Sequence, residues 1–250
     1  MHIAGSGAIG VLVLSGSSGR VEAQRCDVLA AGLPATAASY AWFGAALDLL
    51  PLESFDEPLA LLHERCERLV VIGTSRGAEV ALLLGSLHPE IDAVVGVSPS
   101  DLVWAGLSGA RPQRSSYTRG GEPLPFVPYD DAWVATTEPP EFHDQYLSAL
   151  EKYADRVPAA RIPVERIEGE VVLTAGGDDR LWPATDFADE VAARRGSLAT
   201  TVLTHPTAGH RVLLPGETPQ PARLVHGGTP EADAELGRQL WAELERVCRV

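Results

Sequence analysis

The 250-residue sequence has little positive charge, few cysteines and no long apolar run. Lys and Arg number 20 against 34 Asp and Glu, which gives a formal net charge of −14. Binding of nucleic acid relies on clustered Lys and Arg that neutralise phosphates, so this composition argues against a nucleic-acid partner. No segment approaches the roughly 20 apolar residues that a membrane-spanning helix requires, which argues against membrane insertion.

The three cysteines, Cys26, Cys66 and Cys248, have no paired spacing. An odd, sparse set in a chain of this size is typical of reduced thiols rather than of a disulfide framework. The N-terminus lacks the basic and apolar regions of a signal peptide. No histidine or cysteine cluster has zinc-ligand spacing, and the small-residue loop at 15–19 matches neither G-x-G-x-x-G nor G-x-x-x-x-G-K-[ST], the glycine-rich phosphate-binding motifs. We therefore predict a cytoplasmic protein without metal or cofactor whose partner is a small molecule.

Residues 69–82 have the pattern of a buried strand, a sharp turn and a helix. An apolar, β-branched run at 69–72 leads into Gly-Thr-Ser-Arg-Gly at 73–77, and a stretch rich in Ala and Leu follows. A serine on such a bend is a nucleophile elbow, in which the hydroxyl stands exposed above a sheet. A side chain at Gly73 or Gly77 would crowd the approach of helix to strand, and glycine tolerates strained backbone. We predict that Ser75 is a nucleophile.

The rest of the chain alternates apolar runs with helical stretches, which indicates a parallel sheet with right-handed crossovers. The predicted class is α/β, as an α/β-hydrolase fold with a mostly parallel, doubly wound sheet and helices on both faces. Residues 1–250 are predicted to form one domain. From about 101 to 168 the pattern breaks, and this segment leaves the carboxyl end of a strand. We interpret it as an insertion that borders the active site. Candidate wall residues of the substrate pocket are Trp104, Phe126 and Trp182.

A serine hydroxyl is a poor nucleophile unless a base and an acid activate it, and in α/β-hydrolases these follow in the order serine, acid, histidine. Asp178 and Asp179 follow a predicted strand at 169–175, and His210 follows the last strand. Asp179 is favoured as the acid, because the Arg-Leu-Trp-Pro after it resembles the pattern that follows the acid in many α/β-hydrolases; Asp178 is the alternative. His205 competes for the role of base. His210 is favoured because it lies in a loop free to reach over the sheet.

Two backbone N–H groups are expected to stabilise the oxyanion. One belongs to Arg76, directly after the nucleophile, and the other to Ser17 in the small-residue loop at 15–19, with Gly16 as the alternative. Glu79 is interpreted as a first-turn acid that interacts favourably with the helix dipole. The remaining histidines, His226 among them, are predicted to be surface residues.

These motifs together resemble the acyl-CoA thioesterase / bile acid acyltransferase (BAAT) C-terminal domain family, and dienelactone-hydrolase-like enzymes are expected to share the sheet and the triad. The resemblance lies in residues 10–33, 73–79, 98–100, 176–183, 209–210 and 227–230. It implies an α/β-hydrolase that cleaves acyl thioesters through Ser75, Asp179 and His210. It also implies the hydrolytic branch, because the amide-forming members use cysteine where this chain has Ser75.

The substrate class stays open at this level. The implied substrate is an acyl group on coenzyme A or on a carrier protein, and an acyltransferase, an ester or lactone hydrolase and a catalytically silent binding module are the alternatives. Three arginines of the 101–168 segment are candidates to bind the phosphates of coenzyme A or of a carrier arm. The alternative, which is the commoner case, is an arginine-rich loop exposed to solvent. The three arginines are Arg111, Arg114 and Arg119.

Overall fold

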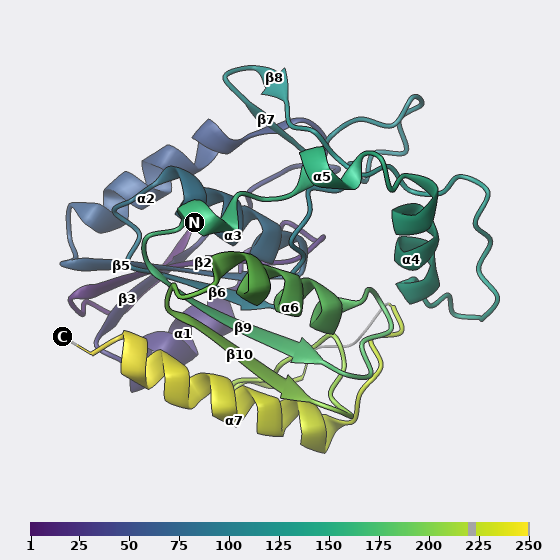
Figure 1. Ribbon diagram of the computed structural model, residues 1–250. Helices are drawn as coiled ribbons and strands as arrows, with labels where there is room; N and C mark the ends of the chain where they lie inside the picture. Colours follow the sequence, from purple (N-terminus) through teal and green to yellow (C-terminus); the bar gives the residue numbers. More distant parts are fainter. Residues whose placement is uncertain (220–223, 250) are drawn as a thin grey trace.

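The computed structural model describes residues 1–219 and 224–249, and its centre is a seven-stranded sheet (Figure 1). The strand order is β1-β3-β2-β5-β6-β9-β10. Only β1 runs antiparallel to its neighbour β3, and the other pairs are parallel. The strands are β1 (His2–Ala4), β2 (Ile9–Leu14), β3 (Ala35–Ser39), β5 (Arg68–Thr74), β6 (Ala93–Val97), β9 (Glu170–Gly176) and β10 (Thr200–His205). The predicted α/β-hydrolase fold with its mostly parallel sheet is confirmed.

Helices cover both faces of the sheet. One face carries α1 (Ala23–Gly32) and α7 (Pro230–Val247), and the other carries α2 (Asp56–His63), α3 (Arg76–Leu87) and α6 (Ala184–Arg195) (Figure 1). The inner strand β2 shows why. Its residues Val11 and Val13 belong to the core under α1 and α7, whereas Leu12 and Leu14 belong to the core on the opposite face. A strand covered on both faces is apolar throughout, so the sequence of β2 is a continuous hydrophobic run.

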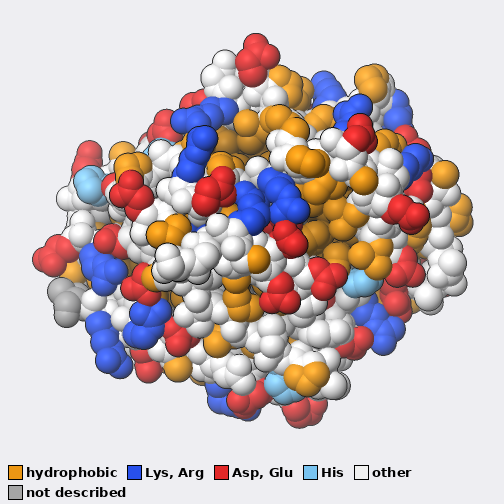
Figure 2. Space-filling view, viewed as in Figure 1, with side chains coloured by type: hydrophobic (Ala, Val, Ile, Leu, Met, Phe, Trp, Pro, Cys, Tyr) orange, Lys and Arg blue, Asp and Glu red, His pale blue; other side chains and the backbone are white. Residues whose placement is uncertain are grey.

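The chain between β6 and β9 leaves the main sheet. It contains α4 (His143–Lys152) and α5 (Val157–Ala160), and its short strands β7 (Tyr117–Arg119) and β8 (Glu122–Pro123) form a second sheet with β4 (Leu50–Pro51). Single 3₁₀ turns lie at Leu52–Phe55 and Val164–Arg166. In Figure 1, α4 stands on the side toward which β9 and β10 point. Figure 2 shows apolar side chains gathered on the same face, in the region between α4 and α6.

The turn between β5 and α3 is packed backbone against backbone. A Cβ atom on Gly73 would lie 2.0 Å from the carbonyl oxygen of Gly77, and one on Gly77 would lie 2.3 Å from that of Ser15. Both distances are far below van der Waals contact, and the neighbours are main-chain atoms that cannot move aside cheaply. The two glycines therefore allow β5, α3 and the end of β2 to meet around Ser75.

We expect Gly73→Ala to destabilise the protein, because its methyl group would overlap the Gly77 carbonyl. Overpacking of this kind costs about 1–3 kcal/mol, sometimes more. Gly44→Ala is the matched control, since a Cβ atom there meets nothing within 4 Å. Urea unfolding of both variants measures the difference, and equal midpoints would contradict the packing described.

Candidate active site

Ser75 has a strained backbone. Its φ of 57° and ψ of −119° put a non-glycine residue at positive φ, where β5 ends and α3 begins. Such a conformation persists only where the surroundings hold it. Here the Ser75 N–H donates to the carbonyl oxygen of Val97 on β6 at 2.8 Å, and the Ser75 carbonyl accepts from Ala78 at 2.8 Å. This is the geometry of a nucleophile elbow.

His210 and Asp179 face each other. The Nδ1 atom of His210 lies 2.7 Å from Oδ2 of Asp179, and the two residues are 4% and 7% exposed. The other carboxylate oxygen of Asp179 accepts the N–H groups of Leu181 at 2.8 Å and Trp182 at 3.2 Å. With Nδ1 bonded to a carboxylate, Nε2 is the nitrogen left to exchange a proton with a reacting group.

The loop that carries His210 is tied down on both sides. The backbone N–H of His210 donates to the carbonyl of His226 at 2.9 Å, and its carbonyl accepts the Ser98 hydroxyl at 2.9 Å. Ser98 follows β6, so His210 is bonded to the end of the strand next to β5, which leads into Ser75. The imidazole is therefore fixed from the backbone as well as from the carboxylate.

The two competing residues have other partners. The carboxylate of Asp178 accepts the N–H of Gly228 at 2.9 Å and the Nε–H of Arg180 at 3.0 Å, so it closes a loop. His205 ends β10, and its Nδ1 accepts the N–H of Thr207 at 3.3 Å. The arrangement thus favours Asp179 and His210 over these alternatives.

The loop after β2 lies against the nucleophile. A Cβ atom on Gly16 would be 3.2 Å from Cβ of Ser75, and the Gly19 N–H closes a tight turn onto the Gly16 carbonyl at 3.1 Å. Ser15 accepts the indole N–H of Trp42 at 3.1 Å, which anchors the start of the loop. Ser17 lines the same cavities as Ser75. Both residues predicted as alternatives for the oxyanion donor, Ser17 and Gly16, thus belong to a loop that borders Ser75.

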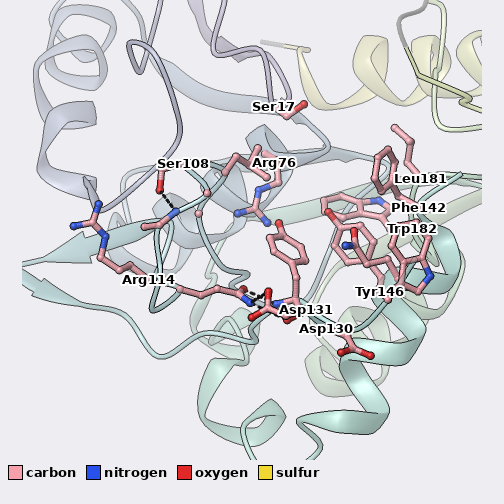
Figure 3. A pocket seen from close by; sticks show the side chains of 18 of the residues that line it. Ser17, Arg76, Ser108, Arg114, Asp130, Asp131, Phe142, Tyr146, Leu181 and Trp182 are labelled. Carbon is pink, nitrogen blue, oxygen red and sulfur yellow. Dashed lines mark hydrogen bonds between the residues drawn. The ribbon is translucent and has the colours of Figure 1, made fainter. Parts of the chain in front are cut away.

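A cavity of about 520 Å³ opens beside Ser75, largely under the segment between β6 and β9. Figure 3 shows Phe142, Tyr146 and Trp182 gathered on one side of it and Arg114 on the opposite side. The centroid of the Trp182 ring also lies 5.6 Å from the centroid of the His210 ring. One wall of the cavity is therefore aromatic and adjoins the base.

Two of the predicted wall residues lie elsewhere. Trp104 is fully buried, stacks on Tyr129 at 6.2 Å and donates its indole N–H to Ser100 at 2.9 Å. Its ring has no surface left for a ligand, so Trp104 supports the aromatic wall from behind. Phe126 packs against the main core and is not among the residues that line the cavity. An aromatic residue in an irregular segment is equally suited to core and pocket, and the sequence pattern does not separate the two.

Arg76 and Glu79 form a buried ion pair, with 2.5 Å between Nη1 and Oε1. The Arg76 guanidinium also donates to the carbonyl of Ala105 at 3.1 Å and to the hydroxyl of Ser116. Burial raises the pKa of Glu79, and the charge of the Arg76 guanidinium opposes this shift. Glu79 does lie in the first turn of α3, but its partner is a side chain. The pair joins the elbow helix to the segment that borders the cavity.

Arg25, on α1, links the segments that carry Ser75 and His210. Its guanidinium donates to the Thr74 hydroxyl at 3.0 Å and to the Val212 carbonyl at 3.0 Å, and it pairs with Glu217 at 2.6 Å. Thr74 precedes the nucleophile, and Val212 lies two residues after the base. Sequence reasoning missed this role because the partners are far apart along the chain, and its sole signal was that Arg25 lies in a motif of the resemblance.

The prediction that His226 is a surface residue is wrong. Its ring is half-buried and lies 5.8 Å from that of His210, and its Nδ1 is buried and bonds to no group of the described residues. Burial lowers the pKa of His226 to about 4; His210 and Arg211 lower it as well, and Asp179 raises it. The sequence feature that could have indicated this position is the Gly-Gly pair directly after His226. It forms a turn next to the loops that carry Asp179 and His210.

The arginines of the cavity rim already have acidic partners. Arg111 pairs with Asp131 at 2.9 Å and Arg114 with Asp48, while Arg119 is an exposed residue of β7.

Across residues 1–219 and 224–249, no three His, Cys, Asp or Glu side chains are placed to hold a metal ion. Nor does any helix within those ranges have the length and apolar character to cross a membrane.

Comparison with known proteins decides the family. The model of the family described as BAAT / Acyl-CoA thioester hydrolase C terminal matches residues 50–246. The chain belongs to this family. A curated relative, the peroxisomal succinyl-coenzyme A thioesterase of Mus musculus, is 22% identical over an alignment of 218 residues, which covers 79% of this chain and 48% of that protein. The chain thus spans about half the length of this curated relative.

Solved structures of other hydrolases share the fold of this family member. The monoacylglycerol lipase of Paleococcus ferrophilus superposes with a TM-score of 0.59 at 14% identity and covers 98% of this chain and 97% of its own. A putative dienelactone hydrolase from Klebsiella pneumoniae gives a TM-score of 0.54 at 12% identity, over 96% and 87% of the two chains. These structures and the family match agree on the α/β-hydrolase fold.

Substitutions at two neighbouring aspartates test which of them acts as the partner of His210. We expect Asp179→Asn to lower kcat by about 10³- to 10⁴-fold, because an amide no longer stabilises the imidazolium or holds the correct tautomer. Asp178→Asn is the matched control, and it should lower kcat by less than about tenfold, since its oxygens bind loop groups rather than His210. Steady-state hydrolysis of a p-nitrophenyl ester measures both. A larger loss in the Asp178 variant would reverse the assignment.

The lowered pKa of His226 predicts a loss of stability in acid. The pKa is about 4 in the folded protein and about 6.5 in the unfolded chain, so the unfolded state binds more protons between these values. The contribution of His226 is complete above pH 6.5 and is lost as the pH falls toward 4. The difference in unfolding free energy between wild type and His226→Gln, followed from pH 7 to pH 4, measures it. A difference independent of pH would refute the shift.

Proposed function

We propose that the protein hydrolyses acyl thioesters through an acyl-Ser75 intermediate, with His210 as base and Asp179 as its partner. The observation that carries the proposal is the 2.7 Å contact between His210 and Asp179 at the sheet edge where Ser75 is held at positive φ. Membership of a family of acyl-CoA thioester hydrolases supports the choice of substrate class.

In the first half of the reaction Ser75 Oγ attacks the thioester carbonyl carbon, and its proton passes to Nε2 of His210. The carboxylate of Asp179 stabilises the imidazolium that forms. The negative charge on the carbonyl oxygen is met by the N–H of Arg76 and by that of Ser17 or Gly16. A backbone donor is held by the fold, so little reorganisation is needed when charge develops.

The intermediate then collapses and the carbon–sulfur bond breaks. The departing sulfur takes the proton from His210 and leaves as a thiol, and the acyl group stays on Ser75 as an ester. A water molecule next gives a proton to His210 and attacks this ester through the same oxyanion site. The return of the proton to Ser75 releases a carboxylic acid. Water is the sole co-reactant.

The cavity beside Ser75 suits the acyl group. Its aromatic wall, formed in part by Tyr146 and Trp182, offers apolar surface that a hydrocarbon chain can cover. The segment at 101–168 would then act as the wall of the acyl site within a single domain. The name of the mouse relative makes coenzyme A thioesters the first substrates to test. The free cysteines are compatible with a reducing compartment such as the cytoplasm.

A combined labelling and kinetic experiment tests this function. A fluorophosphonate probe should form an adduct at Ser75, mapped by mass spectrometry, and the enzyme should release free thiol from a series of acyl-CoA substrates. Ser75→Ala should lose the adduct and at least about 10³-fold of the rate, since a triad without its nucleophile retains little activity. Ser54→Ala, an exposed serine outside the cavities, is the control and should retain both.

Other results would contradict the proposal in distinct ways. Release of p-nitrophenol from esters without release of thiol from any acyl-CoA would point to an ester or lactone hydrolase. Transfer of the acyl group to an added amine or alcohol in preference to water would indicate an acyltransferase. A protein with neither adduct nor turnover would be a binding module.

A further inference from the structure

A second cavity meets the first at Ser75. Its volume is about 270 Å³, and it lies between the loop after β2, the start of α1 and the loop that follows His210. Four residues line both cavities and so mark the junction: Ser17, Ser75, Leu181 and Leu224. A thioester whose carbonyl carbon reaches Ser75 therefore has a cavity on each side.

The position of His210 distinguishes the two sides. His210 lines the second cavity and is not among the residues that line the first. The imidazolium must give its proton to the departing sulfur, so the leaving group has to lie on the side of His210. The acyl group then extends the other way, along the aromatic wall. Each half of the substrate has its own cavity.

The second cavity is polar but carries balanced charge. Two carboxylates, Glu22 and Glu217, and two guanidinium groups, Arg25 and Arg211, take part in its lining, and Arg25 and Glu217 pair with each other at 2.6 Å. Uncharged polar side chains complete it: Ser17, Ser18, Gln24, Thr74 and Thr218. A lining of this kind gives no net attraction to a phosphate, and it suits a neutral chain that makes hydrogen bonds.

His226 is the residue of this cavity that lies beside the reacting end. It lines the cavity, and its ring centroid is 5.8 Å from that of His210. A neutral imidazole has one donor and one acceptor nitrogen, as an amide has one donor and one acceptor group. Burial keeps the pKa of His226 low, at about 4, so the ring is neutral near pH 7.

We propose that the second cavity binds the thiol arm of the substrate, a neutral chain with an amide a few atoms from the sulfur, and that His226 forms a hydrogen bond with that arm. The inference rests on the proposed function and adds the side on which the leaving group lies and the chemistry that recognises it. Specificity for the leaving group and for the acyl group are then separate properties of two cavities.

Two thioesters of one acyl group test the proposal. One has N-acetylcysteamine as its thiol, which carries an amide, and the other has butanethiol, which carries none. The wild type should favour the amide-bearing thioester by about tenfold in kcat/KM, the effect of one hydrogen bond of about 1.4 kcal/mol. His226→Phe should reduce this ratio toward one, and His226→Gln, which keeps a donor and an acceptor, should retain most of it.

A matched control and a cavity-specific variant sharpen the comparison. His205→Phe changes a histidine that is absent from the second cavity and should keep the wild-type ratio. Trp133→Ala alters the first cavity, so it should shift the preferred acyl length to the same extent for both thiols. A wild-type ratio near one would overturn the proposal. So would an equal loss on both thioesters in His226→Phe, which would show that His226 acts through His210.

Failure of the proposed function would be visible separately. If thioesters are not cleaved while Ser75 still reacts with the fluorophosphonate and esters are hydrolysed, the thioesterase assignment fails. The same ratio is then measured with the esters of N-acetylethanolamine and butanol, which differ in the same amide. A preference for the amide-bearing ester that disappears in His226→Phe would support the subsite, and no preference would overturn it.

Discussion

The close contact between backbone segments at the end of β5 is the constraint on which the site depends. Gly73 and Gly77 let the first turn of α3 touch β5 and the end of β2 without intervening side chains. Only this approach lets Ser75 turn at φ 57° with its N–H still bonded to β6. The bend places the hydroxyl at the meeting point of two cavities and puts the N–H of Arg76 at the start of a helix. One packing event therefore sets the positions of Ser75 and of the Arg76 N–H.

The base and the acid depend on a second set of contacts, which run between loops. The carbonyl of His226 and the hydroxyl of Ser98 hold the backbone of His210, and the guanidinium of Arg25 holds Thr74 and Val212 together. The bonds of Ser98 and Arg25 join segments that leave different strands, whereas the bond to His226 closes the connection between β10 and α7. A buried, hydrogen-bonded network of this kind rigidifies the groups it connects, since every broken contact leaves a polar atom without a partner. The site is therefore assembled at the ends of five strands, β2, β5, β6, β9 and β10.

Particular residues show how far sequence reasoning reaches. The order of Ser75, Asp179 and His210 was predicted from local signals, because strand, turn and helix patterns are properties of neighbouring residues. The choice between Asp178 and Asp179 depended on a weak motif, and side-chain geometry separates them by their partners. Trp104 was assigned to the pocket but lies in the core, and His226 was assigned to the surface but lies beside the base. Both errors concern residues in irregular segments, where no periodicity reports which way a side chain points.

The sequence by itself determined the α/β class, the nucleophile elbow and the order of the catalytic candidates. These follow from hydrophobic runs, from glycines at a bend and from the rule that parallel strands end at one edge of a sheet. Only the tertiary structure decided which aspartate meets His210, how Arg25 joins the loops, and that two cavities of different chemistry flank Ser75. Such features arise from contacts between residues that are distant in the chain, and their energies depend on burial and geometry that no local pattern contains.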